Sequence, residues 1–258
     1  MKQSRTTCYY QNYTDDFVES ARQDESLPED YQWTHRNPVY RLASAVLYCA
    51  ALAAALLYDK LVLHIHVENR KVLKSAGKSG CFLYGNHTQP VGDVLGPALY
   101  CFPMRMSAIA SVSNLGIPVL GKLLPMLGAL VLPDSLGQMK KFMEAVGDHV
   151  GKKRCIVIYP EAHVWPWCTF IRPFPAAAFQ FPVLYNVPAF CMTTTYQQRK
   201  HGKKPKIVVY IDGPFFAGPG KKKREQQMEL HDRIYACMDA RSRKSNCEYI
   251  RYQKEKDA

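Results

Sequence analysis

The sequence predicts an α/β fold, in which a mixed central sheet is flanked by helices and preceded by an N-terminal apolar helical segment that associates with a membrane. Three observations predict it. Short apolar runs typical of buried strands occur at 81–84, 155–159, 189–194 and 206–211. Stretches with helical spacing of apolar residues alternate with these runs. A segment without any charged residue covers 42–58.

Length and charge limit the class of protein. The chain has 258 residues, enough for one large domain with a full core. We expect a polar arm over 1–35, an apolar membrane-associating segment over 36–60 and an α/β domain over 61–258. The net charge of +12 suits anionic partners such as phospholipid head groups, phosphorylated cofactors or nucleic acid, or a merely solvated basic face.

The cysteines and the first residues indicate the compartment. Nine cysteines are scattered along the chain without a C-x-x-C pair, so a zinc ribbon or a redox motif is not expected. Several lie in apolar runs, where cysteine behaves as a small buried hydrophobe. Residues 1–30 are polar and show no signal peptide. This pattern predicts a protein of a reducing compartment.

The N-terminal region divides into two parts. Residues 1–35 are rich in tyrosine and poor in aliphatic residues, so we expect a partly disordered or loosely docked arm. A helix over 42–58 would rise about 26 Å, against about 30 Å of hydrocarbon in a bilayer. It could be a buried core helix or a membrane-embedded, re-entrant or interfacial anchor. The flanking Arg36 and Arg41 and the nearby tyrosines favour the anchor.

The remaining elements follow in order. Residues 61–67 alternate like a strand, with His64 and His66 on one face. That pair could ligate a metal, but the polar face of a half-buried strand is the better interpretation. Beyond it we expect a charged connection over 68–79, a strand at 81–84, helical and loop stretches near 94–102 and 115–132, a helix over 135–150, strands at 155–159, 189–194 and 206–211, and a last helix from about 221 to 243.

Polar residues directly follow the strand at 81–84. His87 lies just beyond the strand, and Asp93 follows six residues later. A histidine at a strand tip faces a crevice, and a carboxylate that accepts the proton of one ring nitrogen fixes the tautomer of the imidazole. Such a pair can act as a general base, although a polar loop without chemistry has the same composition.

A second strand tip carries an acidic residue. The strand at 155–159 is followed by Glu161 and His163, with Arg172 further along. In an α/β sheet, ligands bind in the crevice at the carboxyl ends of the strands. We therefore expect both strand tips to face one crevice.

These motifs resemble those of the glycerophospholipid (1-acylglycerol-3-phosphate type) acyltransferase superfamily. Asn86 to Asp93 resembles its N-H-x₄-D block, 116–133 an intervening block, Tyr159 to Glu161 the F-P-E-G-T-R block, and 187–189 the last block. The blocks occur in family order over about 60–215. The departures are a fifth residue between His87 and Asp93, and Ala162, His163 and Val164 in place of Gly, Thr and Arg. The resemblance thus implies a missing phosphate-binding arginine, for which Arg172 could substitute, since a guanidinium binds phosphate in a bidentate way.

The resemblance implies an acyltransferase. His87 would be the catalytic base and Asp93 its orienting carboxylate, with Asn86, Glu161, His163, Arg172 and Lys122 as substrate-binding candidates. It implies an acyl thioester of coenzyme A or of acyl carrier protein as co-substrate, a lysophospholipid or related lipid hydroxyl as acceptor, and no other cofactor and no metal. We expect a peripheral or monotopic protein on the cytoplasmic face of a membrane.

Two other functions remain open. The altered acceptor block is compatible with a catalytically degenerate lipid-binding protein on the same fold. The positive charge and the tyrosines are compatible with a nucleic-acid binder, but that function leaves the apolar segment and both strand-tip motifs unused, so we expect no nucleic-acid partner. The sequence has no P-loop, G-x-G-x-x-G, H-E-x-x-H or G-x-S-x-G motif, which leaves nucleotide hydrolysis, dinucleotide redox chemistry, zinc proteolysis and serine hydrolysis without support.

Overall fold

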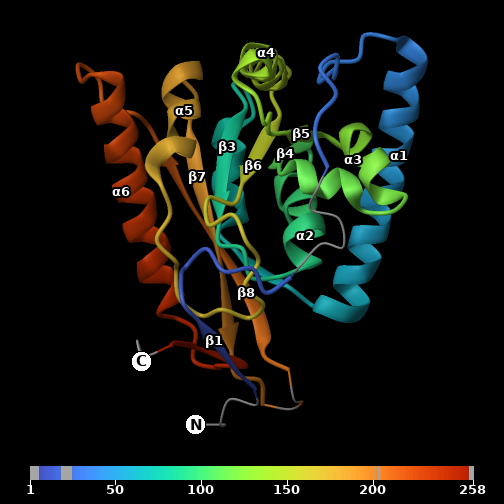
Figure 1. The fold of residues 1–258 in the computed structure, drawn as a ribbon. Helices are drawn as coiled ribbons and strands as arrows, with labels where there is room; N and C mark the ends of the chain where they lie inside the picture. The colour runs from blue at the N-terminus through green and yellow to red at the C-terminus, as the bar shows by residue number, and fades with distance from the viewer. Residues whose placement is uncertain (1–5, 19–24, 201, 203, 256–258) are drawn as a thin grey trace.

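A central sheet of seven strands organises the molecule, which we describe from a computed structural model (Figure 1). The structure describes residues 6–18, 25–200, 202 and 204–255. The strand order is β2–β8–β7–β3–β6–β4–β5, and neighbours are parallel except β7 and β8, which are antiparallel. This confirms the mixed central sheet. The strands are β2 (His66–Glu68), β3 (Cys81–Gly85), β4 (Met106–Ala110), β5 (Ala129–Val131), β6 (Cys155–Ile158), β7 (Ala189–Gln197) and β8 (Lys206–Phe215).

Helices cover both faces of the sheet. Figure 1 shows α5 and α6 on one side of it and α1, α2 and α3 on the other. The α-helices are α1 (Pro38–Tyr58), α2 (Gly92–Cys101), α3 (Leu120–Leu127), α4 (Leu136–Gly151), α5 (Gln180–Tyr185) and α6 (Lys223–Ser242). Shorter 3-10 helices span Arg70–Ala76, Val112–Gly116 and Ala176–Phe179. The helices predicted over 135–150 and 221–243 correspond to α4 and α6.

Alternating side chains of the strands form two cores. On β3, Phe82 and Tyr84 pack toward α4, α5 and α6, whereas Cys81 and Leu83 pack toward α2 and the 3-10 helix Arg70–Ala76. Successive side chains of a strand point to opposite faces, so a strand buried on both sides reads as a continuous apolar run. This explains why β3, β6 and β7 are visible in the sequence.

Helix α1 lies largely exposed on the outside of the domain. Asn37 caps it by accepting a hydrogen bond from Val39 N at 2.8 Å, and Pro38 occupies the first turn. Together with the π-helical turn Asp59–Leu63 it forms an apolar helix of 26 residues that is long and apolar enough to cross a membrane. Of its most apolar stretch of 18 residues, 6% is buried. Leu42 and Val46 are 68% and 63% exposed. The interpretation as a buried core helix is therefore wrong, and α1 is a candidate membrane-associating segment.

The segment after α1 differs from the expected strand over 61–67. Asp59–Leu63 continues the helix as a π-helical turn, His64 has a left-handed backbone with φ of 54°, and β2 is restricted to His66–Glu68. His64 and His66 therefore do not form a strand pair, and His66 Nε2 instead contacts Glu68 Oε1 at 2.9 Å. Leu61 is 73% exposed, so its apolar character extends the exposed helix and does not mark a buried strand.

The N-terminal arm is more firmly packed than expected. Strand β1 (Thr6–Tyr10) pairs in parallel with β9 (Ile250–Lys254), near the opposite end of the chain. Tyr10 forms a small core with Trp165 and Cys168. The expectation of a loosely docked arm is thus wrong for residues 6–18, while part of the arm, 1–5 and 19–24, lies outside the described residues.

Candidate active site

The loop after β3 is fixed by a buried amide. Asn86 is 2% exposed, and its side chain bonds the backbone of Thr194 on β7, with Nδ2 donating to the carbonyl at 3.0 Å and Oδ1 accepting from the amide at 2.8 Å. Asn86 was expected to bind substrate. Because both ends of its amide are engaged with β7, it instead positions the next residue, His87.

His87 and Asp93 form a direct pair. Asp93 lies in the first turn of α2, and its Oδ2 is 2.9 Å from His87 Nδ1. The same oxygen accepts hydrogen bonds from Thr88 N and Gln89 N, both at 2.8 Å. These two donors hold the carboxylate in place beside the imidazole. The extra residue between His87 and Asp93 is accommodated in this turn without breaking the contact.

The free side of the imidazole is Nε2. Within the described part of the chain, this nitrogen has no hydrogen-bond partner, and the His87 side chain is 17% exposed. The ring stacks on Tyr159, with centroids 4.3 Å apart and planes at 16°. Tyr159 in turn donates a hydrogen bond to the backbone carbonyl of Asp93 at 2.7 Å. Stacking and pairing together fix the orientation of the ring and leave Nε2 on its other side.

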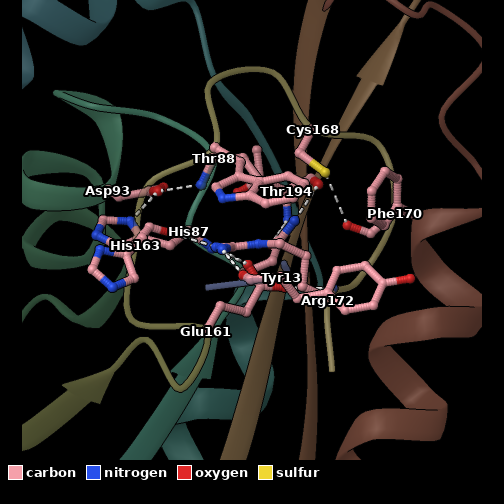
Figure 2. Close-up of polar contacts among 12 residues, drawn as sticks. Tyr13, His87, Thr88, Asp93, Glu161, His163, Cys168, Phe170, Arg172 and Thr194 are labelled. Atoms are coloured by element: carbon pink, nitrogen blue, oxygen red, sulfur yellow. Dashed lines mark hydrogen bonds and ion pairs between the residues drawn. The ribbon is translucent and has the colours of Figure 1, made fainter. Parts of the chain in front are cut away.

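Glu161 and Arg172 form a fully buried ion pair beneath the His87 loop (Figure 2). Glu161 Oε2 accepts hydrogen bonds from Arg172 Nη2 and from the backbone N–H of His87, both at 3.0 Å, and Oε1 accepts from Arg172 N at 3.0 Å. Burial raises the pKa of the Glu161 carboxyl, and the Arg172 charge opposes that shift. The pair therefore supports the backbone of His87 from below.

The rest of the Arg172 guanidinium is also enclosed. Its nitrogens donate to the carbonyls of Tyr13 and His163, and it lies over the Trp165 ring with 4.7 Å to the centroid. Arg172 is 0% exposed. The expectation that Arg172 substitutes for the missing phosphate-binding arginine is therefore not supported by its position, because a ligand cannot reach it without displacing these partners.

The loop after β6 binds the His87 loop through its backbone. Trp165 N donates to the carbonyl of His87, and Trp167 N donates to the carbonyl of Thr88, both at 2.9 Å. Ala162 closes the turn, with its N donating to the carbonyl of Tyr159 at 3.2 Å, and has φ of 66°, in the left-handed region that favours glycine. The two strand-tip loops expected to share a crevice thus meet, and they do so mainly by supporting one another.

The side chains of the two remaining candidates lie outside this hydrogen-bonded group. The His163 ring is 40% exposed and contacts Asp16 at 3.2 Å between Nδ1 and Oδ2, so it faces the N-terminal arm. Lys122 is exposed on α3. The structure therefore brings together Asn86, His87, Asp93, Glu161 and Arg172, leaves His163 at the edge, and leaves Lys122 apart.

A buried tyrosine that no sequence motif indicates also contacts the His87 loop. The hydroxyl of Tyr196, on β7, lies 2.7 Å from Thr88 Oγ1 and accepts from Gln89 Nε2 at 2.8 Å. Burial raises the pKa of Tyr196 well above its usual value, so it remains protonated and can donate. Tyr196 lies 108 residues from Thr88 in the sequence. The apolar pattern of its strand does not distinguish it from an ordinary core residue.

Metal-type ligands gather elsewhere. Among the described residues, one group of at least three has its ligand atoms within 4.8 Å of one another: Cys191, Asp212 and Cys237. Asp212 already binds Arg241 through both carboxylate oxygens, and none of the three contacts His87.

The fold is similar to that of an acyltransferase of known structure. The crystal structure of the 1-acyl-sn-glycerophosphate (LPA) acyltransferase PlsC from Thermotoga maritima is similar to this chain with a TM-score of 0.57, covering 83% of this chain and 87% of that one, at 12% sequence identity. At this identity the similarity establishes the fold alone. No protein-family model matches the chain, and no curated protein is significantly similar to it in sequence.

Proposed function

We propose that the chain is an O-acyltransferase that moves a fatty acyl group from a thioester to a hydroxyl of a lysophospholipid or related lipid. The observation that carries the proposal is the pair formed by His87 Nδ1 and Asp93 Oδ2 at 2.9 Å, with Nε2 without a partner on a partly exposed ring. The similarity to the PlsC structure supports the same chemistry at the level of fold.

The proposed step is direct. His87 Nε2 takes the proton of the acceptor hydroxyl while the oxygen attacks the thioester carbonyl, and the thiolate leaves and is protonated from the imidazolium. Asp93 holds the neutral tautomer with the proton on Nδ1 and stabilises the imidazolium that forms. General-base assistance of this kind contributes about 10²- to 10⁴-fold in rate. No metal and no acyl-enzyme intermediate take part.

The residues of the acceptor loop do not specify a phosphate head group. Arg172 is buried against Glu161, and Val164 occupies the position of the family arginine, so the loop offers no free guanidinium for a phosphate. We therefore propose a lipid hydroxyl as acceptor without specifying its head group. The donor is an acyl thioester of coenzyme A or acyl carrier protein.

The proposed location is the cytoplasmic face of a membrane, with the chain bound as a peripheral or monotopic protein. Support comes from the exposed apolar surface of α1. The acceptor lipid would then reach His87 from the bilayer in which α1 is seated, and membrane lipids are the expected partners.

The test uses purified protein, labelled acyl-CoA and a lipid extract, with mass spectrometry of the products. We expect His87→Ala to lose about 10²- to 10⁴-fold in rate. The matched control is His231→Ala. The His231 side chain is also 17% exposed and its Nδ1 contacts Asp232 Oδ1 at 2.8 Å, but it lies on α6. Unchanged turnover in His87→Ala would refute the proposal, and equal losses in both variants would indicate a folding defect.

A second candidate is a lipid-binding protein on the same fold without turnover. The observation that favours it is the altered acceptor loop, with Ala162, His163 and Val164 in place of Gly, Thr and Arg. It predicts binding to vesicles and no consumption of acyl-CoA with any lipid acceptor in the extract. Detectable acylation of any lipid that depends on His87 excludes it.

A further inference from the structure

A basic hollow lies beside the N-terminal end of α1, which we call the arginine cavity. It consists of two cavities of about 790 and 460 Å³ that share Trp33, His35, Arg41, Asp148 and Lys152 among their lining residues. The charged residues that line them are six cations and three anions: Arg36, Arg41, Arg105, Lys141, Lys152 and Arg154 against Asp30, Glu144 and Asp148. The arginine cavity is therefore positively charged overall.

Two of these cations are held by neutral partners. Arg105 and Arg154 immediately precede β4 and β6, and within the described residues neither forms an ion pair. Arg105 Nη2 instead donates to Ser44 Oγ at 2.8 Å and to the carbonyl of Met126 at 3.0 Å. Arg154 Nη1 donates to Ser107 Oγ at 3.3 Å. Both guanidinium groups are thus held in place by neutral acceptors.

The charge of Arg105 also disfavours the charged form of Arg154. Burial lowers the pKa of Arg154 to about 10, and the charge of Arg105 contributes to the shift. Burial likewise lowers the pKa of Arg105. Asp148 favours the charge of Arg154, but its carboxylate binds Lys152 at 2.5 Å. A pair of fixed, partly buried cations without ion-pair partners of their own is stabilised by any anion that reaches both.

The residues around Arg105 and Arg154 favour a phosphate group that belongs to a lipid. Guanidinium groups bind phosphate oxygens in a bidentate way, and the N-terminus of α1 adds the positive end of a helix dipole. Leu42 lines the smaller cavity and is 68% exposed, and Val46 lies one turn further along the same exposed helix. A phosphate in the arginine cavity would therefore place acyl chains against the apolar surface of α1.

This cavity is separate from the His87 site. Arg154 lies at the start of β3, where its carbonyl accepts from Cys81 N at 3.1 Å, whereas His87 follows the other end of the same strand. Six residues of extended chain span about 20 Å. A phosphate bound to Arg154 is thus out of reach of the imidazole, and the acyl acceptor is not what binds here.

We propose that the arginine cavity binds the phosphate of an anionic phospholipid, with Arg105 and Arg154 as its ligands and the acyl chains lying along α1. The lipid would stay bound as a fixed component and orient the protein on the membrane. The proposal goes beyond acyl transfer and does not depend on the chemistry of His87.

The first experiment measures flotation with vesicles of phosphatidylcholine, alone or with a minor fraction of phosphatidic acid. We expect Arg105→Gln with Arg154→Gln to reduce the preference for phosphatidic acid by about tenfold for each arginine. Lys223→Gln with Arg224→Gln on α6 removes the same charge from exposed residues and should preserve the preference. Equal reductions in the two double variants would overturn the proposal, because net charge would then explain the binding.

The second experiment needs no variant and therefore remains informative if the arginine variants fail to fold. Thermal unfolding of the wild-type chain is followed with dihexanoyl phosphatidic acid, with dihexanoyl phosphatidylcholine and with inorganic phosphate. We expect the melting temperature to rise with dihexanoyl phosphatidic acid and little with the other two. An equal rise with inorganic phosphate would assign the cavity to a soluble phosphate, and no rise with dihexanoyl phosphatidic acid would exclude an anion site. Either result overturns the lipid assignment.

Discussion

Replacing Glu161 by glutamine tests whether this residue supports the His87 loop or binds the acceptor. The carboxylate accepts three hydrogen bonds at 3.0 Å, from His87 N, Arg172 N and Arg172 Nη2. Glutamine has the same shape as glutamate, but its side chain ends in one oxygen, which accepts hydrogen bonds, and one NH₂ group, which donates them. If its oxygen accepts from Arg172 N, its NH₂ group faces the two other donors, and the Arg172 charge loses its partner in a fully buried place.

The expected cost follows from that loss. Removing one member of a buried ion pair destabilises a protein by about 3–5 kcal/mol, because the other charge remains buried without a partner. Glu161→Gln should therefore lower the free energy of unfolding by about 3–5 kcal/mol, measured by urea denaturation at neutral pH. Glu248→Gln is the matched control: it removes a carboxylate that contacts Arg251 at 2.8 Å on the surface, and we expect no resolvable change.

A double variant sharpens the test. Arg172→Met together with Glu161→Gln removes both charges, so it should cost less than the sum of the two single changes. If Glu161→Gln unfolds like the wild type and only raises KM for the acceptor, Glu161 contacts the substrate and the supporting role is refuted. Additive costs in the double variant would likewise show that the two side chains do not depend on each other.

Three further predictions concern other parts of the molecule. Ala162→Gly should raise the free energy of unfolding by about 1 kcal/mol, because Ala162 has φ of 66°, and an unchanged urea midpoint would contradict this. The pKa of His149 is lowered by burial to about 3, below its usual 6.5, so the unfolded chain takes up a proton that the folded chain does not; stability should fall as the pH drops from about 6.5 toward 3, and His149→Gln should flatten that slope in urea denaturation. Val46→Asp, at a position 63% exposed, should weaken flotation with vesicles while leaving the melting temperature unchanged, and a loss of melting temperature with intact flotation would show that Val46 packs within the fold.

Much of the central sheet could be predicted from the sequence, because strands buried on both faces are continuous apolar runs. Strands β3, β6, β7 and β8 were located in this way. The contact of His87 with Asp93 was also predictable, since the two lie in one short loop. The segment at 61–67 was not, because its apolar residues belong to the exposed end of α1, and apolar alternation over so short a run does not distinguish a strand from a helix.

The roles of the residues around His87 depend on long-range contacts, which no local pattern encodes. Arg172 was expected to face a ligand, but the carbonyl of Tyr13, 159 residues away, and the ring of Trp165 enclose it. Asn86 was expected to touch substrate, but its partner is the backbone of Thr194. In both cases polarity was read as function, although the side chain satisfies buried backbone groups.

The pairing of β1 with β9 also imposes an order on how the protein is made. Gln11 hydrogen-bonds Glu255, a residue added to the nascent polypeptide 244 positions later. At a translation rate of about 5–20 residues per second, roughly 12 to 50 seconds pass between the synthesis of β1 and that of β9. Until then Tyr10 lacks the strand that closes over Trp165, whose amide holds the carbonyl of His87. The His87 loop would therefore gain this support only after β9 has been translated and has paired with β1.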